Sequence, residues 1–359
     1  PIPKQIFIVY PVLHEGLKDE YEYVKRTVRS ITPEQLRDHF VDAVYEDVVI
    51  PYTDEDTNTV RNRIWAMPLA LDSMVMYYNK DLFNNAGIST ASEYWDRKFQ
   101  QDVKKLTKQN NKGEIIQSGV ALGGSDNIER SVDLLSVLML QNGAQMMTGN
   151  DVTFHTFPAE MRDRAYNPGL DALRFYTDFA NPAKEVYSWN STLPSSLDLF
   201  IQGKLAMMFG YSYHLPQIQG KAPKLNFSVS PLPQIENNPQ TINIANYWVE
   251  TVSTKSKYSE EAWDFVQYIA KKDNVTKFLN KTKKPTALRA LIDEQIEDPV
   301  IGVFAEQVLT AKSWYKGNNA KAMETIFKEM IDETNSGLVE IDDAILQASR
   351  KVQQTINEE

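Results

Sequence analysis

Two patterns of apolar residues alternate along the chain, one typical of strands and one typical of helices. Strand-like runs lie at 116–122, 205–211 and 225–232. Helical spacing is found near 130–141, 169–180 and 195–202, and again in two late segments, 323–331 and 341–352. Because strands and helices follow one another throughout, the pattern predicts an α/β fold.

The most informative segment is residues 64–88, IWAMPLALDSMVMYYNKDLFNNAGI. We expect a first strand, a turn or crossover through Asp72, and a second strand over 74–78. Asn79 should then cap a short helix that ends at Gly87, since Asn is favoured at the start of a helix and Gly just past its end.

Other segments are less regular. Residues 6–13 fit a strand or a buried helix equally well, and Pro11 is expected to interrupt either one. Residues 51–62, rich in Asp, Thr and Asn, are expected to form a loop. Two further helices are expected to begin at Ser92 and Ser259, which would act as N-caps.

Composition narrows the class of protein. At about 150 residues per domain, the 359 residues are typical of two domains or one large α/β unit. The net charge of −10 argues against a basic nucleic-acid groove. The complete lack of cysteine excludes disulfides, thiol nucleophiles and cysteine-ligated metals. The sequence contains no apolar run of the roughly 18–20 residues needed to span a membrane.

Motifs for common catalytic chemistry are absent from the sequence. The four histidines lack the i, i+4 spacing of a helical zinc site and are expected to be structural or surface residues. The G-x-S-x-G, G-x-G-x-x-G and P-loop patterns do not occur. A secreted carbohydrate-active enzyme stays open as an alternative, because one sequence cannot reveal a carboxylate pair facing across a cleft.

Aromatic residues recur beside turn residues instead. The set is Trp65, Tyr77, Tyr78, Trp189, Tyr211, Tyr213, Tyr247, Trp248, Trp314 and Tyr315. Aromatic faces next to Asp, Asn and Ser groups suit a neutral, polyhydroxylated ligand in a concave site. For each ring taken singly, packing in the core is the alternative, and Trp95 and Trp263 are assigned to the core because they lie on helix stripes.

Three segments, in order, resemble the family 1 extracellular solute-binding proteins, the group that includes maltose-binding protein. They are PLALDSMVMYYNKDLFNNAGI at 68–88, FIQGKLAMMFGYSYHLPQI at 200–218 and NYWVETVSTKSKYSEEAWDFVQYIA at 246–270. A weaker match begins at KPTALRAL, 284–291, and continues through a Trp-containing stretch into two helices. The resemblance extends over about residues 40–357.

The resemblance implies a type II periplasmic-binding-protein fold, in which two interleaved α/β lobes are joined by hinge crossovers. The first lobe is expected to comprise 1–71 plus 246–290, and the second 73–243 plus 294–359. The crossovers would lie near 71–73, 242–245 and 288–294. The opening strand and helix of the family, and its aspartate-containing strand, are not found here, which leaves the completeness of the first lobe open.

Carried over residue by residue, the resemblance implies a ligand site with two kinds of group. Asp72 would accept bonds from sugar hydroxyls, or else serve as a turn or cap carboxylate. Tyr211 and Tyr213 occupy positions where the family often has Trp, and they would stack on the ligand. Trp248 would face the cleft, with Asn246 as a hydroxyl partner.

Two further tryptophans are weaker candidates. Trp314 matches a late Trp of the maltose-binding members only loosely, and Trp65 would line the site or else belong to the lobe core. No metal or cofactor is expected.

The function implied by the resemblance is that of a non-enzymatic receptor of an ABC importer. A neutral carbohydrate would bind between lobes that close on it, and the receptor would deliver it to the membrane permease. A monomer at the extracellular face or in the periplasm is expected, anchored by a lipid on an N-terminal cysteine that this sequence does not show. A purely structural use of the binding fold is a third possibility.

Overall fold

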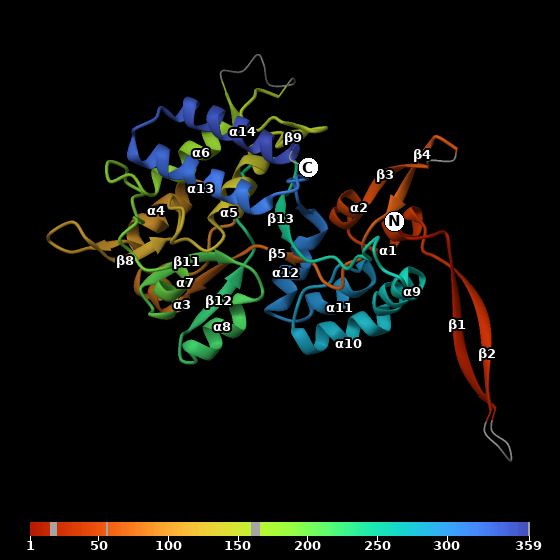
Figure 1. Ribbon diagram of the computed structural model, residues 1–359. Helices are drawn as coiled ribbons and strands as arrows, with labels where there is room; N and C mark the ends of the chain where they lie inside the picture. Colours follow the sequence, from red (N-terminus) through yellow and green to blue (C-terminus); the bar gives the residue numbers. More distant parts are fainter. Residues whose placement is uncertain (15–19, 55–56, 159–165, 358–359) are drawn as a thin grey trace. The chain divides into compact units, whose positions relative to one another are not determined.

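The computed structural model describes residues 1–14, 20–54, 57–158 and 166–357, and it divides the chain into two compact units (Figure 1). Unit 1 comprises Pro1–Asp72 and Ala245–Leu309, and unit 2 comprises Ser73–Ile244 and Thr310–Glu359. Neither unit is continuous in sequence, because the chain crosses from one to the other three times. Both units contain strands and helices.

The three crossings fall in or beside the strands of one small sheet. Its strands are β5 (Asp72–Ser73), β13 (Asn243–Asn246) and β14 (Ala311–Lys312), in the order β14-β13-β5. The first two crossings lie within the ranges expected from the sequence, 71–73 and 242–245.

The third crossing, after Leu309, differs from the expected range of 288–294. The segment in between forms a 3₁₀ turn, η2 (Arg289–Leu291), and the helices α11 (Ile292–Ile296) and α12 (Ile301–Gln307). The turn η2 packs against helices of unit 1, and α11 follows it directly. This packing keeps the chain in unit 1 for longer than the resemblance implied.

Unit 2 is built on a five-stranded mixed sheet. The strand order is β12 (Phe227–Ser230), β6 (Val75–Asn79), β11 (Leu205–Gly210), β8 (Ile115–Val120) and β7 (Lys108–Gln109). β11 runs parallel to β8 and antiparallel to β6. All six residues of β11 are buried, which explains why its sequence is a continuous apolar run and not an alternating one.

Helices surround this sheet and confirm the helical spacing seen in the sequence. Their bounds are α3 (Lys80–Asn85), α4 (Arg97–Leu106), α5 (Ser131–Gln141), α6 (Pro168–Asp178), α7 (Ser196–Ile201), α8 (His214–Lys221), α13 (Ala320–Ser336) and α14 (Ile341–Asn357). A short ribbon, β9 (Met147–Thr148) with β10 (Asp151–Val152), completes the unit. Nearly all of α5 is buried, and α6 and α13 pack against it.

Two of the expected helix caps are wrong, and one is confirmed. Asn79 caps α3 by accepting from the backbone of Asp81 and Leu82, as predicted. The helix expected to start at Ser92 starts later, because Asp96 is its N-cap and accepts from the Phe99 N–H. Ser259 is already the first helical residue of α9, with no side-chain cap before it.

Unit 1 contains two β-hairpins and several helices. The hairpins are β1 (Gln5–His14) with β2 (Glu20–Arg29), and β3 (Val49–Asp54) with β4 (Thr59–Ile64). The further helices are α1 (Pro33–His39), α2 (Asp42–Val48), α9 (Ser259–Ile269) and α10 (Lys272–Thr282). The loop expected over 51–62 is therefore the second hairpin.

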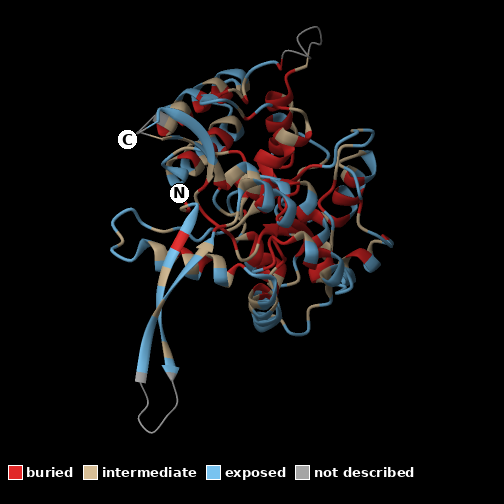
Figure 2. Ribbon diagram, turned by 90° about the vertical axis from the view of Figure 1, so that its right-hand side faces the viewer, coloured by how far each residue is buried: buried red, intermediate tan, exposed pale blue. Residues whose placement is uncertain are grey.

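Burial is uneven in unit 1. Most of the β1–β2 hairpin is exposed, and the fully buried Ile6 lies near its base (Figure 2). Trp263 is buried as predicted, whereas Trp95 is only half-buried and donates its indole N–H to Gln141. Within the described ranges, no helix is both long and apolar enough to cross a membrane.

Candidate functional site

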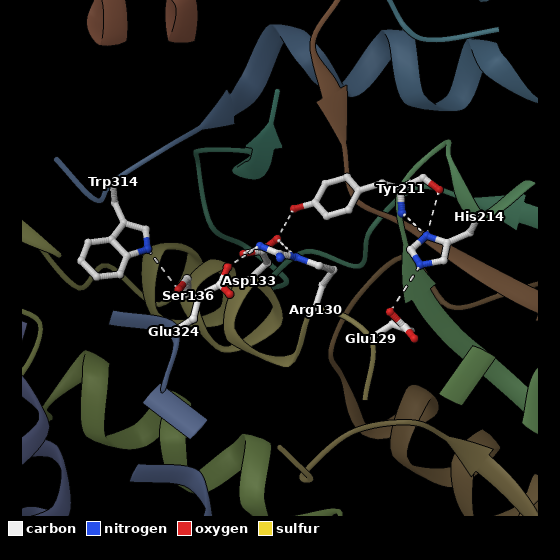
Figure 3. A network of polar contacts seen from close by, with 8 residues as sticks. All are labelled: Glu129, Arg130, Asp133, Ser136, Tyr211, His214, Trp314 and Glu324. Carbon is white, nitrogen blue, oxygen red and sulfur yellow. Dashed lines mark hydrogen bonds and ion pairs between the residues drawn. The ribbon is translucent and has the colours of Figure 1, made fainter. Parts of the chain in front are cut away.

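A network of polar contacts in unit 2 joins the start of α5 to the turn after β11 and to α13 (Figure 3). The Arg130 guanidinium donates to both carboxylate oxygens of Asp133, at 2.8 and 2.9 Å. It also donates to Oε1 of Glu324 at 3.1 Å. The Tyr211 hydroxyl donates to Oδ2 of Asp133 at 2.6 Å. One carboxylate therefore ties together two segments that are far apart in the sequence.

Arg130 occupies an unusual backbone position. It precedes α5 in the left-handed region, with φ 56° and ψ 38°, and no side-chain cap bond accompanies it. This region costs a non-glycine residue about 1–2 kcal/mol, and such residues concentrate at functional sites. Burial tends to lower the pKa of Arg130, but the bond and the charge of Asp133 outweigh burial and raise it. The guanidinium is therefore permanently charged and already paired.

His214 begins α8, and its ring lies against the end of β11 because residue 210 is a glycine. A Cβ atom at Gly210 would lie 2.6 Å from Nδ1 of the ring. The Tyr211 backbone N–H donates to this Nδ1 at 3.0 Å. Since a backbone N–H can only donate, Nδ1 holds the lone pair and the proton of the neutral ring lies on Nε2. The Tyr211 carbonyl, 3.2 Å from Nδ1, is then a contact without a hydrogen bond.

The Nε2 atom of His214 is buried and has no hydrogen-bond partner among the described residues. Oε2 of Glu129 lies 3.9 Å away, beyond hydrogen-bond distance. The His214 side chain has the largest influence on the pKa of Glu129 and lowers it, against the opposing effect of burial. A buried donor and an ionised acceptor thus lie 3.9 Å apart with no hydrogen bond between them, and we call this separation the gap; it is short enough for one oxygen atom to bond to both.

Tyr213 supplies the exposed aromatic surface beside this gap. Its ring is stacked on that of Tyr211, with centroids 5.9 Å apart, and lies 4.3 Å from the His214 ring. Tyr213 is 39% exposed, whereas Tyr211 is fully buried. Of the two tyrosines expected to stack on a ligand, only Tyr213 offers a ring to solvent. Tyr211 acts through its hydroxyl, which positions Asp133.

Trp314 does not form an exposed platform either. It is buried, and its indole N–H donates to the Ser136 hydroxyl of α5 at 3.1 Å. Its ring packs against Phe154 and Phe327, with centroids 6.3 and 5.5 Å away. The structure therefore places Trp314 in the core of unit 2. Its partner Ser136 lies about one helical turn along α5 from Asp133.

The remaining expected residues lie in unit 1. Trp248, just after β13, is 84% exposed, and Asn246 at the end of that strand is half-buried. Tyr247 between them is fixed by the 2.5 Å bond that its hydroxyl donates to Asp47. Trp65 is half-buried and packs edge-on against Tyr52, and its buried Nε1 has no hydrogen-bond partner among the described residues, so its assignment to the site or to the core stays a prediction.

Asp72 is buried in β5 at the first crossing between the units. Both roles expected for it, a ligand contact and a turn or cap carboxylate, stay predictions. Four residues of the unit 2 site were not predicted as site residues: Glu129, Arg130, Asp133 and His214. The histidine was the detectable one, because it ends the G-Y-S-Y-H run quoted in the resemblance. Nothing in the sequence marks which carboxylates meet it.

In the described part of the chain, no group of three or more His, Asp or Glu side chains is placed to hold a metal ion. The site consists of one unbonded imidazole N–H, several carboxylates and an exposed ring. These groups can bind hydroxyls and the apolar face of a small polar molecule.

Comparison with known proteins identifies the family. The sequence profile of the bacterial extracellular solute-binding proteins matches residues 24–276. A galactooligosaccharide-binding protein of Bacillus subtilis (strain 168) is 22% identical over 254 residues, which are 70% of this chain and 56% of that protein. A maltodextrin-binding protein of the same organism is 25% identical over 252 residues, which are 66% of this chain and 54% of that protein. The chain spans about half the length of these curated relatives.

Solved structures show the same fold. The cyclic alpha-maltosyl-1,6-maltose binding protein from Arthrobacter globiformis aligns with a TM-score of 0.66 at 18% identity, over 89% of this chain and 79% of that chain. The type II binding-protein fold with two α/β lobes, expected from the resemblance, is thereby confirmed. Because the profile covers well over half of the chain, the protein belongs to the family of bacterial extracellular solute-binding proteins.

Proposed function

We propose that this protein is the receptor of an ABC importer and that its ligand is a neutral carbohydrate. Membership of a binding-protein family supports a receptor over an enzyme. The relatives named for galactooligosaccharide and maltodextrin binding support a carbohydrate ligand. The receptor would work outside the cytoplasm and deliver its ligand to the permease. The lipid anchor stays a prediction.

The observation that carries this proposal is the gap between His214 and Glu129. A sugar hydroxyl that reached Nε2 would accept its hydrogen bond and donate to the Glu129 carboxylate, and it would thereby satisfy a buried donor that has no partner among the described residues. The exposed Tyr213 ring lies beside the gap and offers its face to the C–H side of the same sugar ring.

The charges around the gap favour a neutral ligand over an anionic one. Two cations act on Glu129, and both are already paired: Arg130 with Asp133 and Glu324, and Lys328 with Asp126. Glu129 adds a further negative charge at the gap itself. An anionic group would meet this carboxylate while both of these cations are already engaged, whereas a hydroxyl can both donate and accept.

Transport by this family implies that ligand binding favours a closed arrangement of the two lobes. A ligand can shift that equilibrium only as far as it binds one arrangement more tightly than the other. We therefore propose that contacts from unit 2 alone, such as those of His214 and Glu129, give weak binding, and that closure adds the remaining affinity.

A ligand screen tests the proposal directly. The 359-residue chain is heated with linear α-glucans, galacto-oligosaccharides, manno-oligosaccharides and simple hexoses, with glycerol and acetate as controls. A receptor shows stabilisation that grows with ligand concentration as RT ln(1 + [L]/Kd), and the sugar is recovered unchanged. Release of shorter sugars at repeated turnover would establish the enzyme alternative and contradict the receptor proposal.

A further inference from the structure

In the β1–β2 hairpin of unit 1, the register shows which backbone groups bond across the hairpin and which point outward. Its register pairs Phe7 with Thr27 and Pro11 with Tyr23. At the base of the hairpin the Ser30 N–H donates to the Lys4 carbonyl, so these two residues form a hydrogen-bonded pair. Hydrogen-bonded and non-hydrogen-bonded pairs alternate along antiparallel strands, so the even-numbered residues bond across the hairpin. In the odd-numbered residues of both strands, the backbone N–H and C=O groups therefore point away from the partner strand.

The outer edge of β1 is closed to another strand. The outward N–H of Phe7 donates to the Glu260 carboxylate of α9 at 2.6 Å. Pro11 stands at another outward position and has no N–H to offer, which blocks strand addition. The same geometry explains why Pro11 does not interrupt β1 as expected. The bond that a proline lacks is one that the hairpin does not use at this position.

The outer edge of β2 is open. Its outward backbone groups belong to Tyr21, Tyr23, Lys25 and Thr27, and the N–H groups of the last three have no partner in the described part of the chain. Such an edge is a template for a further strand. The hairpin is ten residues deep on each side, and a two-stranded sheet of this kind is marginally stable by itself.

One face of the hairpin is also apolar and exposed. Its exposed side chains are Phe7 (59%), Val9 (53%), Leu13 (42%), Tyr21 (64%) and Tyr23 (71%). A contiguous apolar face of this kind on an open sheet edge marks an interaction surface. Both features point to association through β2.

We propose that the occupant of this edge is β2 of a second copy of the chain, paired antiparallel about a two-fold axis at Val24. In this register Tyr23 exchanges backbone bonds with Lys25 of the second copy, and Tyr21 does so with Thr27. The two hairpins become one four-stranded sheet, which has the strand number that an isolated hairpin lacks. A two-fold interface requires a self-complementary surface, and β2 meets this requirement.

The charges of β2 are compatible with this register and oppose two of its neighbours. Glu22 faces Arg26 of the second copy twice, once on each side of the axis, at positions where the side chains of facing residues are close. A carboxylate accepts several bonds, so this pairing does not require Glu22 to give up its other contacts. A shift of two residues in one direction places Lys25 against Lys25, and a shift of four in the other places Glu22 against Glu22.

The lack of cysteine in the chain makes the register testable by a single substitution. With the axis at Val24, the two copies of Val24→Cys face each other at a Cα separation of about 4.5 Å, within the range that a disulfide spans. Under mild oxidation this variant should form a covalent dimer of twice the 41.0 kDa chain mass. Val28→Cys lies on the same face of the same strand but away from the axis, and it should crosslink much more slowly.

Proline variants and a charge exchange separate this interface from non-specific association. Tyr23→Pro removes an outward N–H from β2, and analytical ultracentrifugation should then show a monomer. Val9→Pro removes an outward N–H from β1, the closed edge, and should leave the dimer unchanged. Glu22→Arg should weaken dimerisation at least tenfold, and adding Arg26→Glu should restore it.

A chain that stays monomeric throughout the concentration series would overturn the proposal. So would equal crosslinking of the two cysteine variants, or a double exchange no better than the single one. Association that Val9→Pro abolishes and Tyr23→Pro leaves intact would also overturn it, by assigning the interface to β1.

Discussion

The Tyr211 hydroxyl donates a 2.6 Å hydrogen bond to Oδ2 of Asp133, and this bond fixes the turn after β11 against the first turn of α5. Both residues come from unit 2, 78 positions apart in sequence. The bond positions the carboxylate that also holds Arg130. It makes Tyr211 a residue that shapes the site while its own ring stays buried.

Tyr211→Phe should lower the free energy of unfolding by about 1.5–3 kcal/mol, the usual range for a hydrogen bond to a charged group. The phenyl ring keeps the packing, so the loss reports the hydroxyl alone. Urea denaturation measures it. Tyr258→Phe is a suitable control, because Tyr258 is 71% exposed and should change stability by a few tenths of a kcal/mol at most. Equal effects of the two variants would contradict the role assigned to the Asp133 bond.

Gly210→Ala should displace the His214 ring, because the new Cβ atom would lie 2.6 Å from Nδ1. We expect a destabilisation of about 1–3 kcal/mol from overpacking, together with weaker sugar binding. Gly220→Ala is the matched control. It lies in α8 with no heavy atom within 4 Å of the new Cβ, so it should stabilise the helix slightly. A neutral Gly210→Ala variant with unchanged binding would show that the ring is not held as described.

Glu129→Gln should weaken carbohydrate binding by about 10- to 100-fold, the equivalent of one hydrogen bond to a charged acceptor. The amide keeps the shape of the side chain but removes the negative charge that accepts the ligand hydroxyl. Isothermal titration calorimetry with a sugar found in the ligand screen measures the change. Glu185→Gln is a control of the same kind, since the side chain of Glu185 is 83% exposed. Wild-type affinity in Glu129→Gln would remove Glu129 from the site.

Tyr213→Ala should lower sugar affinity about tenfold, while Tyr213→Phe should retain the stacking part of it. The comparison isolates the ring from the hydroxyl. If both variants bind as the wild type does, the exposed ring is not a ligand platform. In that case Trp248, the other highly exposed aromatic among the predicted site residues, becomes the better candidate.

Lowering the pH should reduce the free energy of unfolding through protonation of Glu129. The pKa of this carboxyl is lowered in the folded state, chiefly by His214, from an ordinary value of 4.5. Its contribution to stability is therefore complete above pH 4.5 and is lost as the pH falls through the lower folded pKa. Unfolding measured from pH 6 to pH 3 should show a steeper loss in the wild type than in Glu129→Gln. Parallel curves would mean that the pKa of Glu129 is not perturbed.

Much of unit 2 could be predicted from the sequence because its pattern is local. The apolar run of β11 and the Asn79 cap each depend on a few neighbouring residues, and both are found as expected. The β3–β4 hairpin was missed because its residues are polar and largely exposed, so they show no apolar alternation. A strand over 6–13 was one of two alternatives, and its continuation through Pro11 was not expected because only the register shows which way the proline nitrogen points.

The candidate site was harder to predict because it depends on which side chains meet. Tyr211 and Tyr213 are two residues apart, yet one is fully buried and the other exposed. Trp314 resembles a platform in sequence, but Ser136 and two phenylalanines hold it in the core. His214 and Glu129 lie 3.9 Å apart in the structure but 85 positions apart in the sequence, and no spacing rule relates them.

The interleaving of the two units has a consequence for biosynthesis. Unit 1 cannot be completed before residue 309 has emerged from the ribosome, and unit 2 needs the helices that end at residue 357. The segment Ser73–Ile244 of unit 2 is therefore made before the second part of unit 1, Ala245–Leu309. The order in which continuous domains generally fold during synthesis, N-terminal domain first, is therefore not available to these two interleaved lobes.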